Sequence, residues 1–505
     1  MIRDGNNKSF WQSTEKIEDF GTDFKELTFH TIVVGAGITG VTLAKELQNR
    51  GISCLLIDKK NPGFGTTGGT TAHINNFYDT SYDEIIANFG NDAGRELVVG
   101  THKTLDYIVQ NIRKYAVACE FDTCDFFLFS TNEKQTKKLD EIYRAHKQLG
   151  IKTVEDSSIP FDLSFEKVIK IEAQGQFHPI KYINGLLQAY KIEGGAFLLN
   201  QAIESFNNDG KNITIKTSDA RIFTAKNLVW ATHVPPGKNR FNLLLTAYRS
   251  YVMVFKLTDP PTALAQAADL YDPYHYFRYH VSSNGNYLIA GGFDHKTGVG
   301  ENSEKCFTEL DNYVRRYLGF SDFVAKWSSQ YYVSADGLPY IGRMPSEKNI
   351  YVSTGYGGNG MTFGTMASLV IPDLLEGKEN ELSKMLSPGR IKPIVSVKSV
   401  LSVGINASKH LIKDKLGAKQ VEIFGTIPLN EGRIVTFENK NLAVFRDKDG
   451  GYRALNASCT HMGCTVTWNP SEQSWDCPCH GSRFDIEGNV LNGPAITNLK
   501  REEYF

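Results

Sequence analysis

Residues 31–58 read TIVVGAGITGVTLAKELQNRGISCLLID, and this stretch decides the fold of most of the chain. A β-branched run ends in Gly35-x-Gly37-x-x-Gly40, a helical pattern follows, and a second apolar run stops at Asp58. In this strand–turn–helix–strand context, glycines let the backbone approach a pyrophosphate at a helix N-terminus, and the later carboxylate accepts hydrogen bonds from a ribose. A glycine-rich turn without a ligand is the alternative. The candidate dinucleotide contacts are Gly35, Gly37, Ile38, Thr39, Gly40, Asp58 and Lys59.

Two later stretches bear on whether the dinucleotide is NAD or FAD. One is a loop of small residues from Thr66 to Ala72. The other begins at Asp336-Gly337-Leu338-Pro339-Tyr340-Ile341-Gly342 and continues through an apolar strand to Gly355-Tyr-Gly357-Gly358-Asn-Gly360-Met361, before a helical run to about Leu375. These motifs resemble the D-amino-acid oxidase-like flavoprotein family, which includes glycine and sarcosine oxidases, over roughly residues 28–380.

The resemblance implies FAD and an α/β FAD-binding domain of Rossmann type, interleaved with an antiparallel-sheet substrate domain. It places the N-terminus of the late helix at the flavin N1–C2=O edge, where a helix N-terminus stabilises the negative charge of reduced flavin. A tight turn without a ligand is the alternative for the late glycines. Covalent attachment of the flavin through His73 is not expected. The further FAD contacts that it implies are Thr66, Thr67, Gly68, Thr70, Thr71, Ala72, Ile203 near the adenine, Gly357, Gly358, Gly360 and Met361.

The substrate domain is expected from alternating apolar and polar residues over 248–255, 274–278 and 287–290, a pattern typical of an antiparallel sheet with one covered face. Two strand arginines, Arg249 and Arg278, are the candidate substrate-binding residues. In the resembling family, an arginine from this region grips the substrate carboxylate, which a guanidinium matches with two hydrogen bonds. An ion-pair or solvated role is the alternative for each. Asp294-His295-Lys296 either lines the active site or forms a polar turn.

The C-terminal part contains CTHMGC at 459–464 and CPCHGSRF at 477–484. Cys459 and Cys477 offer thiolates, and His461 and His480 offer imidazoles. Two thiolates on one iron and two histidines on the other define a Rieske [2Fe–2S] centre, whose potential lies well above that of an all-cysteine cluster. A structural zinc site is the alternative for these pairs. Cys464 and Cys479 each lie in one of the two ligand loops, so a disulfide could join the loops over the cluster.

These loops resemble the Rieske family of the disulfide-bearing type found in respiratory cytochrome complexes. The resemblance implies that Ser482 donates a hydrogen bond to a cluster sulfur and that Gly493-Pro494-Ala495 forms a third loop over the cluster. A tyrosine that serves as a second donor in the family is replaced here by Phe484. Losing this donor destabilises the reduced cluster, so we expect a lower potential than in those relatives.

Length and composition set the wider frame. A chain of 505 residues predicts about three domains, and a net charge of −1 gives no sign of nucleic-acid binding. No apolar run is long enough to span a bilayer and the N-terminus lacks a signal-peptide core, which predicts a cytoplasmic protein. The remaining cysteines, at 54, 119, 124 and 306, are scattered and predicted to be buried. The expected parts are a leader (1–27), the FAD-binding domain (28–84, 173–240 and 330–380), the substrate domain (85–172 and 241–329), a linker with a helix (381–418) and an all-β Rieske domain (419–505).

The linker pattern from Val397 to Ile412 predicts a helix packed on the FAD-binding domain, with a membrane-surface helix as the alternative. No second Gly-x-Gly-x-x-Gly follows a strand, so no NAD(P)H site is expected. A flavin takes two electrons at once and a [2Fe–2S] cluster carries one, which favours an FAD-dependent dehydrogenase that oxidises a small amine or amino acid and passes electrons through the cluster to a one-electron redox protein. A reductase or monooxygenase fed through the cluster, and a non-enzymatic redox carrier, are the alternatives.

Overall fold

The glycine-rich turn lies at the end of the central strand of an eight-stranded sheet. The computed structural model describes residues 5–15, 24–299, 302–319, 322–390, 426–438 and 440–502. The main path of this sheet is β16-β17-β10-β1-β2-β7, with β9 and β8 added beside β10, and its inner pairs are parallel. The strands are β1 (Thr28–Val34), β2 (Cys54–Ile57), β7 (Ala196–Leu198), β8 (Ile203–Asn208), β9 (Ile213–Thr217), β10 (Ile222–Trp230), β16 (Tyr340–Arg343) and β17 (Ile350–Thr354).

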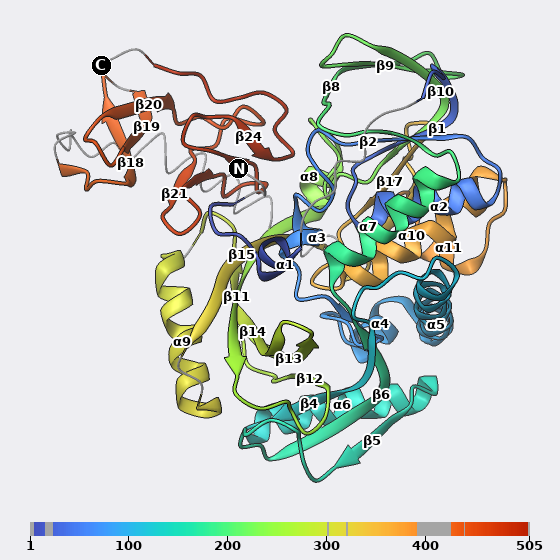
Figure 1. Ribbon diagram of the computed structural model, residues 1–505, viewed down its shortest axis with the longest axis vertical. Coiled ribbons are helices and arrows are strands. Elements are labelled where there is room, and N and C mark those ends of the chain that lie inside the picture. The colour runs from blue at the N-terminus through green and yellow to red at the C-terminus, as the bar shows by residue number, and fades with distance from the viewer. Residues whose placement is uncertain are drawn as a thin grey trace.

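Helices cover this sheet because its inner strands are apolar on both faces; β2, for example, is buried at every position. Helix α2 (Ile38–Asn49) contacts α7 (Pro179–Ile192) and α10 (Gly360–Leu375), and Figure 1 shows the three together in front of the strands. Helix α5 (Asn91–Lys114) packs on α10, with α4 (Tyr82–Phe89) and α11 (Glu381–Met385) beside it. The His178 side chain caps α7, whose first residue is Pro179.

The predicted strands of the substrate domain lie in a nine-stranded sheet of order β15-β11-β14-β13-β12-β4-β6-β3, with β5 paired to β6. Its pairs are antiparallel except β12 with β4, which run parallel. The strands are β3 (His73–Ile74), β4 (Asp122–Ser130), β5 (Thr153–Asp156), β6 (Lys167–Gln176), β11 (Leu245–Leu257), β12 (Ala265–Ala268), β13 (His275–Ser282), β14 (Gly285–Lys296) and β15 (Phe323–Ser334). Helices α6 (Glu133–Leu149) and α9 (Ser303–Leu318) pack on it, and α8 (Phe241–Leu244) precedes β11.

Two segments lie differently from the expected domain division. Strand β3 falls within 28–84 but belongs to the substrate sheet, and β15 continues that sheet past residue 329. The segment 1–27 is also more than a polar leader. Its helix α1 (Phe10–Thr14) buries Phe10 and Trp11 in the main core, and Trp11 Nε1 donates a hydrogen bond to the Thr70 carbonyl at 2.6 Å.

The C-terminal domain is built from two small antiparallel sheets, which confirms its predicted all-β class. One contains β18 (Glu431–Phe437), β19 (Lys440–Arg446) and β20 (Tyr452–Asn456); the other contains β21 (Thr467–Asn469), β22 (Ser474–Asp476), β23 (Arg483–Phe484) and β24 (Val490–Asn492). The expected linker helix from Val397 to Ile412 lies outside the described residues. No described helix is long and apolar enough to cross a membrane, and the cytoplasmic location stays a prediction.

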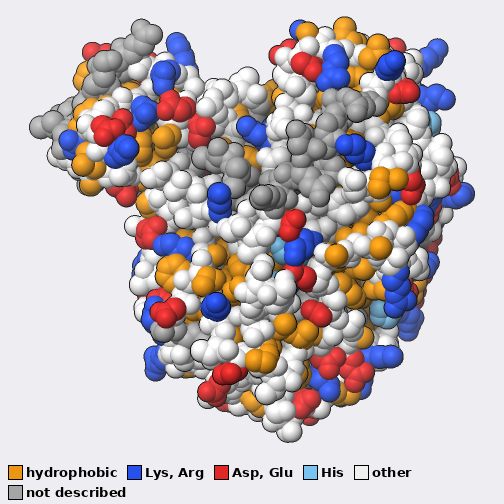
Figure 2. All heavy atoms as spheres, in the orientation of Figure 1, with side chains coloured by type: hydrophobic (Ala, Val, Ile, Leu, Met, Phe, Trp, Pro, Cys, Tyr) orange, Lys and Arg blue, Asp and Glu red, His pale blue; other side chains and the backbone are white. Residues whose placement is uncertain are grey.

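The C-terminal domain sits beside α9, β15 and the N-terminal segment, and a notch in the surface separates its outer part from the dinucleotide sheet (Figures 1 and 2). Ser303 at the start of α9 donates to Asn469, and Ser471 donates to Glu304. The buried carboxylate of Glu472 accepts hydrogen bonds from Ser328 on β15 and from the backbone of Asn6. The C-terminal domain is therefore held against the rest of the chain by polar contacts on several sides.

Candidate active site and metal centre

The turn after β1 has the backbone geometry that the glycine motif requires. Gly35 has a φ of 113°, and a Cβ there would lie 2.4 Å from the Ala231 carbonyl oxygen. A Cβ on Gly40 would lie 1.7 Å from the Gly35 oxygen, so the turn packs directly on α2. Gly37 caps α2 without a side-chain hydrogen bond of its own. This arrangement suits a phosphate.

The three nucleotide-binding stretches meet in space. Helix α3 (Thr66–Gly69) brings Thr67 Oγ1 to 3.0 Å from the backbone nitrogen of Ile38, from which it accepts a hydrogen bond. The hydroxyls of Thr39 and Tyr356 lie 2.9 Å apart and join α2 to the late glycine turn. Loops separated by about three hundred positions in the chain thus form one wall.

A cavity of about 1010 Å³ runs along this wall. Most of the predicted FAD contacts line it: Gly35, Gly37, Ile38, Thr39, Asp58, Lys59, Thr66, Thr67, Thr70, Thr71, Ile203, Gly357, Gly358, Gly360 and Met361. Gly40, Gly68 and Ala72 do not. A Cβ on Gly68 would lie 2.1 Å from the Gly63 oxygen, and the Ala72 carbonyl accepts from Arg278, so these three positions serve backbone packing.

The carboxylate at the end of β2 fits a nucleoside, because it can accept hydrogen bonds from a ribose. Asp58 lines the cavity, and its carboxylate accepts hydrogen bonds from the backbone nitrogens of Ala36 at 2.6 Å and Lys60 at 2.8 Å. These bonds fix the carboxylate at the cavity wall, while burial raises its pKa.

His73 also lines the cavity. Its ring nitrogens lie 3.0 Å from Thr71 Oγ1 and 3.4 Å from the Phe277 carbonyl, and burial lowers its pKa to about 3.

Neither predicted substrate-binding arginine lines the cavity. Arg249 donates to Ser328 Oγ at 2.7 Å, and its Nη2 lies 3.8 Å from Asp476 of the C-terminal domain. Arg278 donates to the carbonyls of Thr71 and Ala72, each at 2.9 Å. Both side chains are fully buried among these partners, so the geometry supports a structural role for each. Alternation along a strand could not show which sheet face met the cavity.

The substrate sheet supplies a different set of polar groups to the cavity. Asp294 accepts hydrogen bonds from Ser250 and, at 2.7 Å, from Tyr331, while Tyr276 lies 2.8 Å from Ser250 Oγ. Asp79 accepts from the backbone nitrogen of Gly358 at 2.6 Å. All of these residues line the cavity. Of the four residues from the substrate sheet, only Asp294 is named by the sequence analysis as a possible active-site residue, in a segment that equally favours a polar turn.

Burial raises the pKa of Asp294 to about 7, and the charge of nearby Asp79 acts in the same direction. Burial also raises the pKa of Asp79, although its side chain is exposed to the open cavity. The site therefore contains two carboxylates that resist being ionised together.

The predicted cluster ligands come together in the C-terminal domain. The rings of His461 and His480 lie 4.9 Å apart, and the Nδ1 atoms of both are buried with no hydrogen-bond partner among the described residues. The Cys459 and Cys477 thiols are buried and hydrogen-bonded to each other, which lowers the pKa of Cys459 to about 7. Two adjacent thiols and two orphaned imidazole nitrogens fit a Rieske cluster.

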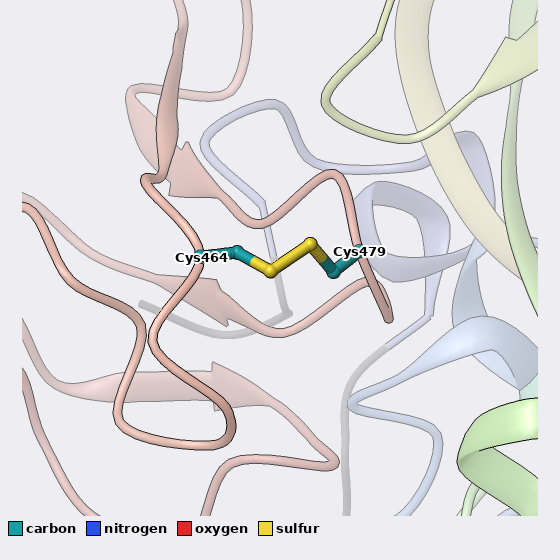
Figure 3. Close-up of a disulfide and its surroundings, with 2 residues drawn as sticks. All are labelled: Cys464 and Cys479. Carbon is teal, nitrogen blue, oxygen red and sulfur yellow. A yellow bond between two sulfur atoms is a disulfide. The ribbon is translucent and has the colours of Figure 1, made fainter. Parts of the chain in front are cut away.

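The disulfide between Cys464 and Cys479 is present and joins the two ligand loops (Figure 3), with the Cα atoms 6.5 Å apart. The sulfurs of Cys464, Cys477 and Cys479 lie within 4.8 Å of one another, but Cys464 and Cys479 form the disulfide, so of these three only Cys477 has a thiol that could bind iron. Ser482 is fully buried, and a hydrogen bond from it helps to lower the pKa of Cys459. Its Oγ also accepts from the Ala495 nitrogen, which ties down the third loop.

The loop that carries His480 rests on β15. Gln330 Nε2 donates to the Gly481 carbonyl at 2.9 Å, and the Tyr332 hydroxyl donates to the carbonyls of His480 and Gly493. A Cβ on Gly481 would lie 2.4 Å from that of Ala247, so only glycine allows this approach. Residues 490–493 and 495–497 line the same cavity as the glycine-rich turns.

Comparisons with known proteins agree with both parts of the chain, the one that contains the glycine-rich turns and the one that contains the cluster loops. A family model described as FAD dependent oxidoreductase matches residues 30–373, and a Rieske [2Fe-2S] domain model matches residues 421–502. The chain is 31% identical over 498 residues to "Putative Rieske 2Fe-2S iron-sulfur protein YhfW" of Bacillus subtilis, covering 98% of this chain and 97% of that protein. It is 22% identical to gamma-glutamylputrescine oxidoreductase of Escherichia coli, over 80% of this chain and 97% of the other. Glycine oxidase from Geobacillus kaustophilus superimposes with a TM-score of 0.59 at 18% identity, over 72% and 100% of the two chains.

Proposed function

Because the chain belongs to the FAD dependent oxidoreductase family and carries a Rieske [2Fe-2S] domain, we propose that it oxidises a small amine or amino acid and passes the electrons through the cluster to a one-electron redox protein. Bound FAD would supply the acceptor for a hydride from the carbon next to nitrogen, and a bound cluster would carry one electron at a time. The resulting imine is hydrolysed by water. The names of the relatives support this class of substrate, since they include an oxidoreductase of gamma-glutamylputrescine and a glycine oxidase.

One observation carries the proposal: a single cavity is lined by the glycine-rich turns, by the substrate sheet and by the third loop of the Rieske domain. Strand β15 connects these parts. Residues 329–332 all line the cavity, and two of them, Gln330 and Tyr332, also bind the backbone of the loop that carries His480. The protein thus holds its redox loop directly against the cavity wall, as an enzyme that moves electrons between the two sites requires.

The direction of flow follows from the ligand set. Two histidine ligands raise the potential of a [2Fe–2S] cluster, which makes it a better electron acceptor than an all-cysteine cluster. Phe484 is fully buried and offers no hydroxyl, which lowers the potential relative to relatives that have tyrosine there. The retained Ser482 hydroxyl acts in the opposite direction. We therefore propose flow from the flavin to the cluster.

An anaerobic reaction of the full-length protein tests the proposal. Mixed with a panel of amines and amino acids, the protein should show bleaching of the flavin first and a reduced Rieske signal by electron paramagnetic resonance afterwards. His461→Ala should retain FAD and its bleaching but lose both the signal and the reduction of cytochrome c, used as a one-electron probe. Met462→Ala, which changes the exposed neighbour of this ligand, is the control and should behave like the parent. Reduction of cytochrome c at the parental rate by His461→Ala would exclude the cluster as the exit.

A further inference from the structure

The part of the cavity lined by the substrate sheet is acidic. Asp294 extends from β14, and Asp79 comes from the loop that follows β3. The groups that contact the two carboxylates are all neutral donors: Ser250 and Tyr331 for Asp294, and the Gly358 backbone for Asp79. The hydroxyl of Tyr274 lies 3.4 Å from Asp79. The groups that titrate or carry charge around Asp294 are Asp79, Tyr274, Tyr276, Tyr331 and His275.

No lysine or arginine on the substrate sheet lines the cavity within the described residues. The lysines that do line it are Lys59, next to the predicted ribose carboxylate Asp58, and Lys238, whose charge acts on His461 of the cluster. Among the described residues, neither Asp79 nor Asp294 forms an ion pair with a basic side chain. A substrate carboxylate entering here would meet two acidic groups, while His73 of β3, which also lines the cavity, stays uncharged because burial lowers its pKa to about 3.

A second observation points to a ligand beside Asp294. Along β15, Ser328, Gln330 and Tyr332 bind groups of the Rieske domain, so the alternate positions Ser329 and Tyr331 point to the other face. Tyr331 on that face binds Asp294. Ser329 is 8% exposed and lines the cavity, and its hydroxyl has no hydrogen-bond partner within the described part of the chain. A buried hydroxyl without a partner is expected to bind a ligand or a water.

The charge of the ligand follows from solvation. Water in the open cavity hydrates the carboxylates, and a ligand that fills the cavity removes this water. Two carboxylates then lose hydration without compensation unless the ligand itself is positively charged or donates strong hydrogen bonds. Resting on the amine-oxidising function proposed above, we propose that the substrate is a cationic amine without a carboxylate next to its reacting carbon, and that Asp79 and Asp294 bind its positive charge.

Matched pairs of compounds that differ only in the α-carboxylate test the proposal: putrescine and ornithine, cadaverine and lysine, tyramine and tyrosine. The anaerobic full-length holoprotein is titrated with each compound, and binding is read from the perturbation of the flavin absorption spectrum, separately from bleaching. The amine of each pair should bind at least about tenfold more tightly than its amino acid, because only the amino acid brings a carboxylate that the two aspartates repel. Equal or tighter binding of the amino acids, or no binding of any amine, overturns the proposal.

The two readouts separate this inference from the function on which it rests. If amino acids bleach the flavin and the amines do not, oxidation of C–N bonds stands and the cationic, carboxylate-free substrate is wrong. If amines perturb the spectrum but no compound bleaches the flavin, the site binds cations as proposed and the oxidative function fails.

Variants identify the residues. Asp294→Asn and Asp79→Asn preserve size and retain an oxygen acceptor, but each removes one negative charge. Each should weaken amine binding by about tenfold to a hundredfold with the FAD content unchanged. The matched control is Asp259→Asn, an exposed carboxylate after β11, which should bind like the parent. Asp79→Asn could lose FAD because Asp79 also binds the late glycine turn. In that case the amine affinity of Asp294→Asn alone tests whether the aspartates bind the positive charge. Parental amine affinity in Asp294→Asn would overturn the assignment.

Discussion

Asp476 is the residue whose replacement tests most directly how the Rieske domain is attached. Its carboxylate accepts a hydrogen bond from Arg483 Nε at 3.0 Å and lies 3.8 Å from Nη2 of Arg249, which belongs to the substrate sheet. All three side chains are almost completely excluded from solvent. Asp476→Asn keeps the shape of the side chain but leaves two buried guanidinium groups without their shared negative charge.

The expected cost is about 3 kcal/mol. Breaking a buried ion pair by removing one partner costs about 3 to 5 kcal/mol, because the remaining charge stays buried. The lower end applies because Arg249 keeps its hydrogen bond to Ser328 and the nearby charge of Glu472. Burial of Asp476 acts to raise its pKa. The positive charges of Arg483 and, to a smaller extent, Arg249 outweigh burial and hold the pKa below its ordinary value of 3.8. Its contribution is therefore complete at higher pH and disappears only as the pH falls through the still lower pKa of the folded protein.

Urea unfolding followed by the fluorescence of Trp475 provides the assay, because this fully buried indole is adjacent to position 476. Between pH 5 and 8, Asp476→Asn should destabilise the Rieske domain by about 3 kcal/mol, with no dependence on pH. Asp449→Asn, at an exposed position of the same domain, is the control and should stay within about 0.5 kcal/mol of the parent. A change in Asp476→Asn as small as that of the control would refute the reasoning.

Three further predictions concern the cluster loops and the cavity. Cys464→Ser removes a crosslink worth up to about 3 kcal/mol, so the cluster should assemble but its visible absorption should decay faster than in the parent. Gly481→Ala should cost about 1 to 3 kcal/mol more in urea unfolding than Gly463→Ala, because both have positive φ but only the first would press a Cβ against Ala247. Binding of a cationic amine should weaken about tenfold from pH 8 to pH 6, since a pKa of about 7 leaves Asp294 mostly protonated at the lower pH; affinity that is flat over this range would contradict its role.

The parts of the site that could be predicted are those whose residues are close in sequence. Gly35 and Gly40 are needed by one local turn, and Cys459 and His461 belong to one loop, so spacing alone was informative. The resemblance then extended this reading to the late glycines and to the disulfide, which is confirmed.

The substrate end could not be read in this way. Asp79 and Asp294 are more than two hundred positions apart, and the contacts that place Asp79 in the cavity come from the distant Gly358 and Tyr274. The alternation that revealed the strand of Arg249 did not show that its side chain points to the Rieske domain. Trp11 lies in a segment whose polar composition hid a short helix, in which Phe10 and Trp11 are the buried aromatic residues.

The bond between Asn6 and Glu472 spans 466 positions, and it has a consequence for how the protein is made. At synthesis rates of about 5 to 20 residues per second, roughly 25 to 90 seconds pass between the two residues. During that interval the residues before α1 and Ser328 of β15 lack the Glu472 carboxylate, to which both donate hydrogen bonds in the folded protein. Translation of the last domain therefore completes contacts at both earlier sites, and a chain that stops before residue 472 leaves them facing water.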